Sequence, residues 1–243
     1  MSTEKPAIVL VHGAFAESAS WNRVIARLRE ESFEVTAVAN PLRSVSGDAA
    51  YVRDVVAAIG RPVVLVGHSY AGIVITEAAS GNDAVVGLTY VGAFAPEHGE
   101  SAFELSGKFP GSTLGDALVA YPLAAGGVEL AIAKDAFHQQ FAADVPAAEA
   151  AVMAATQRPV TQAALTEGLP TTAPAWRTIP SWFVFGTDDR NIPATLQRFM
   201  AERAGSRGTR EIAGASHAPT VSRPDQVSAT ILDTVAGVTE QYR

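Results

Sequence analysis

The stretch Val63–Gly72 places a serine between a run of aliphatic residues and a segment typical of a helix. It reads Val-Val-Leu-Val-Gly-His-Ser-Tyr-Ala-Gly, with the serine at position 69. A serine on a sharp strand-to-helix turn exposes its hydroxyl, and small neighbours let backbone segments approach closely. Amides at the start of the following helix favour a developing negative charge. The pattern predicts that Ser69 is the nucleophile of an acyl-transfer reaction.

This stretch also allows two competing interpretations. Ser69 is also suited to a plain helix N-cap, a position where serine is preferred. In addition, the glycine that usually stands two residues after such a serine is replaced by Ala71, and Gly72 comes next. A dinucleotide-binding turn is disfavoured because its glycine fingerprint follows the first strand. There the chain has His-Gly-Ala-Phe at positions 12–15, without further glycines in register.

A serine nucleophile needs a base, and the base needs an acid that orients it. On a parallel sheet of this kind the acid and then the histidine follow the serine, each in a loop after a later strand. The loop after the fifth predicted strand contains Asp188 and Asp189, and the loop after the sixth contains His217. Each loop alone is equally typical of an ordinary turn. Together, in this order, they predict the triad Ser69, Asp189 and His217, with Asp188 as a turn or capping residue.

Two backbone amides are predicted to complete the site. The N–H of Ala14, in the loop after the first strand, and the N–H of Tyr70, directly after the serine, are placed to form an oxyanion hole. Such donors stabilise the negative oxygen of a tetrahedral intermediate.

The other four histidines are expected to have no catalytic role. His12 ends a buried strand, and His68 precedes the nucleophile, so both are interpreted as structural. His98 and His138 are expected on the surface. No two histidines have the spacing of metal ligands, so neither a metal nor another cofactor is predicted.

The elements that position these loops alternate between strand and helix. Short apolar runs predict six strands, at 7–12, 34–39, 62–67, 85–94, 180–186 and 210–212. Helical periodicity predicts helices at about 21–31, 47–59, 69–80 and 193–204, and from about 222 onward. This alternation predicts an α/β fold with a doubly wound, mostly parallel six-stranded sheet. Ligands bind such sheets beyond the carboxyl ends of the strands, where the predicted site residues lie.

The alternation is interrupted between residues 96 and 178. That segment shows no clear strand pattern and is rich in alanine, glycine and proline. It is too long for a simple connection, so we expect a helical cap inserted into the core. The predicted domains are a core of residues 1–95 and 179–243 and a cap of residues 96–178.

Composition excludes several classes of protein. Of 243 residues, 48% are hydrophobic and 18% charged, which argues against a disordered chain. The formal net charge of −7 argues against a nucleic-acid or anionic-membrane surface. The absence of cysteine excludes a disulfide scaffold, a thiolate zinc site and a cysteine nucleophile. With no targeting segment or apolar run long enough to span a membrane, a cytoplasmic location is expected.

Together these motifs resemble the α/β-hydrolase superfamily over nearly the whole chain. The similarity is greatest to the cap-bearing branch that contains bacterial esterases, plant methyl-ester hydrolases and hydroxynitrile lyases. It implies a six-stranded core, a helical lid, and a serine hydrolase that cleaves small carboxylic esters through an acyl-enzyme with Ser69, His217 and Asp189.

Other chemistries on this fold stay open to different degrees. Hydroxynitrile lyases of this branch carry a lysine beside the catalytic histidine, but here Ala218 follows His217, which disfavours that activity. A cofactor-free perhydrolase, a carbon–carbon hydrolase and a non-catalytic ligand-binding member remain alternatives.

Aromatic residues are the candidates for the substrate pocket. Those predicted to contact the substrate are Phe15, Phe103, Phe137, Phe141 and Trp176. Packing of the cap against the core is an equally good explanation for any one of them. Without a cluster of basic residues in the cap, the expected partner is a small, uncharged or weakly polar ester, bound by a monomer or homodimer.

Overall fold

Six parallel strands form the central sheet of the computed structural model, which describes residues 5–239. Their order across the sheet is β2-β1-β3-β4-β8-β9, and every neighbouring pair is parallel. The strands are β1 (Ala7–Val11), β2 (Val35–Val38), β3 (Val63–His68), β4 (Val85–Val91), β8 (Ser181–Gly186) and β9 (Gly208–Ile212). The predicted fold class of a doubly wound parallel sheet is thereby confirmed.

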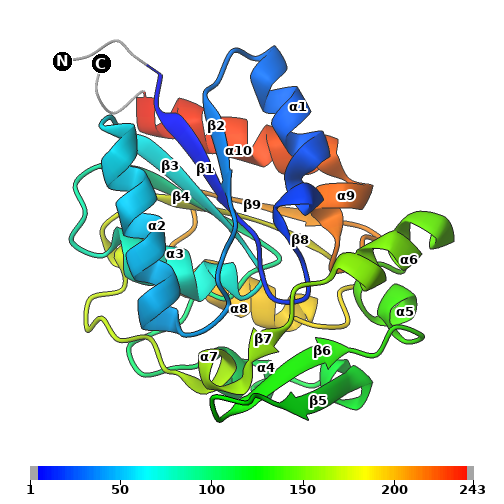
Figure 1. Cartoon of the computed structure of the whole chain (residues 1–243). Helices are drawn as coiled ribbons and strands as arrows, with labels where there is room; N and C mark the ends of the chain where they lie inside the picture. The colour runs from blue at the N-terminus through cyan, green and yellow to red at the C-terminus, as the bar shows by residue number, and fades with distance from the viewer. Residues whose placement is uncertain (1–4, 240–243) are drawn as a thin grey trace.

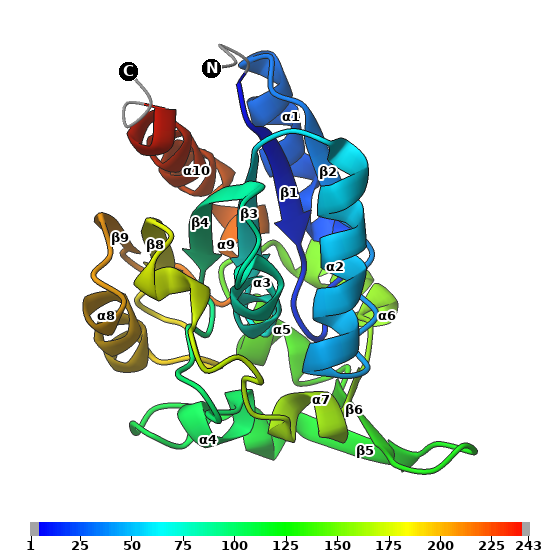
Figure 2. The ribbon, with the colours of Figure 1, turned by 90° about the vertical axis from the view of Figure 1, so that its left-hand side faces the viewer.

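Helices cover both faces of this sheet (Figures 1 and 2). One face carries α2 (Val45–Ile59), α3 (Ala71–Ala79) and α8 (Ala194–Arg203), and the other carries α1 (Asn22–Glu30) and α10 (Pro224–Thr239). A single turn, η1 (Ser18–Trp21), precedes α1, and α9 (Pro219–Ser222) precedes α10. Residues alternate along β1 and β3 between the two hydrophobic cores, as a sheet covered on both faces requires.

The segment 96–178 lies beyond the carboxyl ends of the strands, below the sheet in Figure 1. Its helical elements are α4 (Ala102–Ser106), η2 (Leu114–Ala117), α5 (Phe137–Phe141), α6 (Ala147–Thr156), α7 (Gln162–Thr166) and η3 (Ala175–Arg177). It also contains a three-stranded sheet of β5 (Leu118–Pro122), β6 (Val128–Ile132) and β7 (Val160–Thr161). The expectation of an all-helical insertion was therefore wrong.

A hairpin signal in the sequence explains this second sheet. Strands β5 and β6 pair antiparallel, from Leu118 opposite Ile132 to Pro122 opposite Val128. The loop between them ends in Gly126 and Gly127, whose φ angles of 92° and 91° are readily adopted only by glycine. Adjacent glycines between two short apolar runs are typical of a hairpin. The surrounding alanines favoured helix and obscured that signal.

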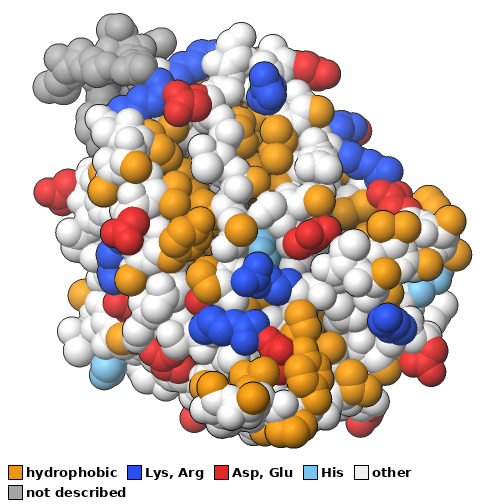
Figure 3. Space-filling model, in the orientation of Figure 1, with side chains coloured by type: hydrophobic (Ala, Val, Ile, Leu, Met, Phe, Trp, Pro, Cys, Tyr) orange, Lys and Arg blue, Asp and Glu red, His pale blue; other side chains and the backbone are white. Residues whose placement is uncertain are grey.

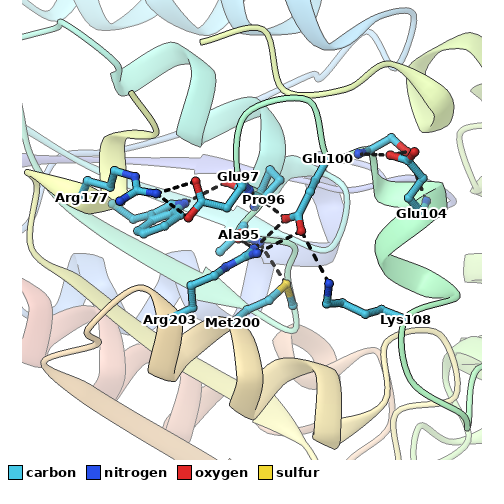
Figure 4. A network of polar contacts seen from close by, with 11 residues as sticks. Ala95, Pro96, Glu97, Glu100, Glu104, Lys108, Arg177, Met200 and Arg203 are labelled. Carbon is cyan, nitrogen blue, oxygen red and sulfur yellow. Dashed lines mark hydrogen bonds and ion pairs between the residues drawn. The ribbon is translucent and has the colours of Figure 1, made fainter. Parts of the chain in front are cut away.

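Polar contacts join the two ends of the segment to each other and its start to α8 of the core (Figure 4). Glu97, near the start of the segment, forms an ion pair with Arg177, near its end, and the nitrogen and oxygen atoms are 2.7 Å apart. Arg203 of α8 donates to the carbonyl oxygen of Ala95 at 2.7 Å and pairs with Glu100 at 2.8 Å. These contacts lie where the segment leaves and rejoins the core.

Charged side chains of both signs are interspersed on the face shown in Figure 3. Within residues 5–239, no helix is both long and apolar enough to cross a membrane.

Candidate active site

Ser69 occupies the tight turn between β3 and α3. Its φ of 57° lies in the left-handed region that side chains other than glycine rarely adopt. The carbonyl oxygen of Ser69 accepts hydrogen bonds from the N–H groups of Gly72 and Phe94, at 3.0 and 3.2 Å. This conformation directs a nearly buried side chain, 7% exposed, toward the carboxyl edge of the sheet.

The close packing of this turn explains why Gly72 stands one residue later than usual. A Cβ atom at Gly72 would lie 2.1 Å from the carbonyl oxygen of Phe94, and one at Gly67 would lie 2.8 Å from that of Ala71. Ala71 itself is fully buried without such a conflict. The close approach to the next strand therefore falls on position 72 in this chain.

His217 lies between Ser69 and Asp189. Its Nε2 atom is 2.8 Å from Ser69 Oγ, and its Nδ1 atom is 2.7 Å from Asp189 Oδ2. A carboxylate only accepts hydrogen bonds, so Nδ1 carries the proton and Nε2 is free to accept one from the Ser69 hydroxyl. The structure thus brings together the three residues predicted as a triad, in the geometry of a nucleophile, base and acid.

The backbone holds the Asp189 carboxylate from the other side. Its Oδ1 atom accepts hydrogen bonds from the N–H groups of Asn191 and Ile192, at 2.8 and 2.9 Å. Asp188 is exposed and is contacted by the hydroxyl of Thr187. Of the two adjacent acids, Asp189 is therefore the one that faces His217.

The amides of Ala14 and Tyr70 lie in the wall of a cavity next to Ser69. In the described part of the chain, neither N–H has a hydrogen-bond partner. Gly13 lets the first loop approach the turn, because a Cβ there would lie 2.5 Å from the carbonyl oxygen of His68. Ala14 and Tyr70, whose N–H groups are predicted to form an oxyanion hole, therefore flank the loops that meet at Ser69.

The side chain of Tyr70 is anchored away from the cavity. Its hydroxyl donates to Asp48 Oδ2 at 3.0 Å, and Asp48 is fully buried in the first turn of α2. Burial raises the pKa of Asp48, and burial together with the Asp48 charge raises the pKa of Tyr70. Nothing in the sequence pattern pointed to this pair, which joins α2 to the turn before α3.

His12 and His68 are buried and support the loops around the site. His12 accepts a hydrogen bond from the Asn40 N–H at Nε2 and donates from Nδ1 to the Gly13 carbonyl. His68 donates from Nε2 to the carbonyl oxygen of His217 at 2.8 Å. Burial lowers the pKa of His12 to about 4, and burial together with the nearby His217 lowers the pKa of His68 well below its usual value.

The remaining histidines lie away from Ser69. His98 is exposed at the outer part of the cavity, and His138 is half-buried near the Val145 carbonyl. Among residues 5–239, no three His, Cys, Asp or Glu side chains form a cluster that could hold a metal ion.

The cavity beside Ser69 has a volume of about 900 Å³. Of the five predicted substrate contacts, Phe15 and Phe103 line it, and Phe103 on α4 is 68% exposed at its rim. Six apolar residues that the sequence did not single out for this role also line it: Phe94, Leu105, Leu114, Leu118, Leu165 and Ile192.

The other three predicted contacts are packed elsewhere. Phe137 and Phe141 stack on each other, and the edge-to-face contact of Phe141 places its ring 4.9 Å from that of His217. The indole N–H of Trp176 donates to the carbonyl oxygen of Pro96 at 2.9 Å. None of the three is among the residues that line the cavity. Their aromatic character indicated that they would be buried, but not whether their rings would point into the cavity.

Comparison with known proteins agrees with this geometry. A model of the alpha/beta hydrolase family matches residues 8–230. The chain belongs to the alpha/beta hydrolase family.

Individual members of the family resemble the chain over nearly its full length. It is 33% identical to the alpha/beta hydrolase nvfD of Aspergillus novofumigatus, with 92% of this chain and 94% of that protein covered. It is 28% identical to esterase PIR7B of Oryza sativa subsp. japonica, with 93% and 94% covered. The crystal structure of polyneuridine aldehyde esterase superimposes with a TM-score of 0.81 at 20% identity, over 95% of this chain and 99% of that one.

The close packing of the turn around Ser69 leads to a prediction about the stability of a Gly72 variant. Replacing Gly72 by alanine should lower the free energy of unfolding by about 2–3 kcal/mol, since its methyl group meets a backbone oxygen that cannot move freely. Urea unfolding followed by circular dichroism measures this. Gly115→Ala is the control, because a Cβ there meets nothing within 4 Å. Equal stability of the two variants would contradict the packing described for the turn.

The lowered pKa of buried His12 leads to the prediction that the protein loses stability as the pH falls. Between pH 6.5 and about 4 the unfolded chain protonates His12 and the native protein does not, so the free energy of unfolding falls as the pH falls. The slope from His12 alone reaches about 1.4 kcal/mol per pH unit. Urea titrations at pH 7 and pH 5 should show a smaller difference in His12→Gln than in the wild type. Parallel losses in both proteins would show that native His12 takes up its proton normally.

Proposed function

We propose that this protein is a serine hydrolase that cleaves carboxylic esters through an acyl-enzyme. The observation that carries the proposal is the continuous hydrogen-bonded arrangement of Ser69, His217 and Asp189, next to two unpaired amides and an apolar cavity. The family relatives named as esterases support it. A vestigial ligand-binding site would not need the base, the acid and both amide donors in register.

The proposed reaction begins with transfer of the Ser69 hydroxyl proton to His217 Nε2 while Oγ attacks the ester carbonyl. The carbonyl oxygen becomes negative and accepts hydrogen bonds from the amides of Ala14 and Tyr70. His217 then gives the proton to the departing alcohol, which leaves an acyl group on Ser69. A water molecule, deprotonated by His217, releases the acid by the same steps in reverse.

Asp189 stabilises the positive imidazolium that forms in each half of the reaction. Because its Oδ1 is held by two backbone N–H groups, its Oδ2 stays directed at His217 Nδ1. This fixes the tautomer in which Nε2 faces the serine.

We infer that the segment 96–178 acts as a cap that selects the substrate. It supplies most of the cavity wall, including α4 and the residues just before β5. The ammonium group of Lys108 is 3.9 Å from Glu100, which also pairs with Arg203. The carboxylate and ammonium groups that line the cavity belong to Glu100, Glu104 and Lys108. Two negative charges against one positive charge disfavour an anion, so the cavity suits an uncharged or weakly polar ester.

The nucleophile assignment is tested with a fluorophosphonate probe, which labels activated serines. The wild type should bind one probe molecule per protein chain and should hydrolyse p-nitrophenyl butanoate. The Ser69→Ala variant should show neither labelling nor hydrolysis. Folding of both proteins is checked by circular dichroism. A folded wild-type protein that resists the probe would refute the proposal.

The acid assignment predicts unequal effects of two neighbouring substitutions. Asp189→Asn should lower kcat about 10³- to 10⁴-fold, because His217 would adopt the wrong tautomer and lose the partner of its positive charge. Asp188→Asn, which changes an exposed residue, should leave kcat within a few-fold of the wild type. Steady-state kinetics on p-nitrophenyl butanoate compares them, and a larger loss in Asp188→Asn would contradict the assignment.

A further inference from the structure

Asn191 is a buried polar residue in the wall of the cavity. It is only 2% exposed, and it lies two residues after Asp189 in the loop that follows β8. Its backbone N–H is used by the Asp189 carboxylate. Its side-chain amide is a separate group, and the mechanism proposed above does not use it.

Three hydrogen bonds fix the direction of that amide. Gln140 of α5 donates from Nε2 to the carbonyl oxygen of Arg190, at 3.0 Å, and accepts from the Thr113 hydroxyl at Oε1, at 2.8 Å. A carbonyl oxygen can only accept, so the nitrogen and oxygen of Gln140 are identified. The same Nε2 donates to Asn191 Oδ1 at 2.8 Å. The side-chain oxygen of Asn191 is therefore directed at Gln140, and the side-chain nitrogen Nδ2 points away from Gln140.

The nitrogen of Asn191 has no partner in the protein. Among residues 5–239, no hydrogen-bond acceptor is found for Nδ2. The atom is also not among the fully enclosed polar atoms that lack a partner. The atom thus retains a small exposed area, and the cavity is the space that Asn191 borders. A nearly buried donor without an acceptor is costly, so a ligand that supplies one gains specificity.

Other polar side chains of the cavity differ from Asn191 because they already have partners. The carboxylate of Glu104 accepts a hydrogen bond from the Ser101 hydroxyl, the hydroxyl of Ser106 donates to the Ala102 carbonyl, and Lys108 lies beside Glu100. Apolar side chains, among them Phe15 and Ile192, line the same cavity. One oriented donor in apolar surroundings is the usual way in which a pocket fixes the orientation of a ligand.

We propose that Asn191 Nδ2 donates a hydrogen bond to a second oxygen of the substrate, which makes Asn191 a specificity-determining residue. The substrate class is an ester that carries an additional acceptor, such as an ether, ketone or second ester oxygen, a few bonds from the reacting carbonyl. This inference rests on the proposed esterase function. The additional acceptor belongs to either the acyl part or the alcohol part of the ester, and the experiment below distinguishes these two cases.

The test compares pairs of esters that differ by one oxygen in place of one CH₂ group. The acyl pair is p-nitrophenyl methoxyacetate and p-nitrophenyl butanoate. The alcohol pair is 2-methoxyethyl butanoate and butyl butanoate. For each pair, the ratio of kcat/KM for the oxygen-containing ester to that for the alkyl ester is measured in wild type and variants. Intrinsic reactivity differences cancel, because the same two esters are compared throughout.

Two variants remove the donor in different ways. Asn191→Leu removes the whole amide, and Asn191→Asp keeps an oxygen for Gln140 but has no N–H. In one of the two pairs, both variants should lower the ratio about 3- to 10-fold, the usual worth of one hydrogen bond. Ser106→Ala, which changes another cavity residue whose hydroxyl is already paired, should leave the ratio unchanged.

Failure of this inference can be told apart from failure of the proposed function. If the proteins hydrolyse the alkyl esters but the ratio in Asn191→Leu equals that of the wild type in both pairs, the role of Asn191 is refuted and the esterase function stands. If the wild type hydrolyses no ester, the dissociation constants of the alcohol pair are measured by calorimetry. Tighter binding of 2-methoxyethyl butanoate that depends on Asn191 would then uphold the donor role, and equal binding would refute it.

Discussion

The backbone conformation of Ser69 is the constraint on which the surrounding structure depends. A φ of 57° at a residue with a side chain costs about 1–3 kcal/mol and persists only where the neighbouring structure enforces it. Here it is enforced by the hydrogen bonds to the Ser69 carbonyl and by contacts so close that Gly13, Gly67 and Gly72 have no room for a Cβ atom. Those glycines therefore follow from the shape of one turn.

Burial of the polar groups around this turn imposes a second requirement, that each has a partner. His217 is fully buried and Asp189 is 5% exposed, yet both imidazole nitrogens and both carboxylate oxygens are hydrogen-bonded. Such groups destabilise a fold when unpaired and stabilise one arrangement when paired. The loops after β8 and β9 are therefore ordered by the same contacts that align the proposed base with the nucleophile.

The sequence allowed the sheet and the proposed triad to be predicted because both depend on local patterns. Buried parallel strands are short aliphatic runs, and their carboxyl ends meet at one edge, so loop residues far apart in the chain fall together. Strand ends were less accurate: the fourth was predicted to reach residue 94, but β4 ends at Val91. Contacts such as Gln140 with Asn191, or Phe141 with His217, join segments whose relative position no local pattern specifies.

The contacts of α5 and the residues after it show that the segment 96–178 is more than a cover for the cavity. Gln140 binds the loop of Asp189, Phe141 packs its ring against His217, and Asp144 accepts a hydrogen bond from Ser216. The proposed acid and base are thus contacted from both sides, by the loops of the sheet and by the inserted segment. Since a misplacement of about 1 Å can cost two orders of magnitude in rate, movement of this segment would alter the geometry of catalysis together with access to the cavity. In the proposed enzyme, selection of the substrate and alignment of the reacting groups are consequently coupled through one short helix, α5.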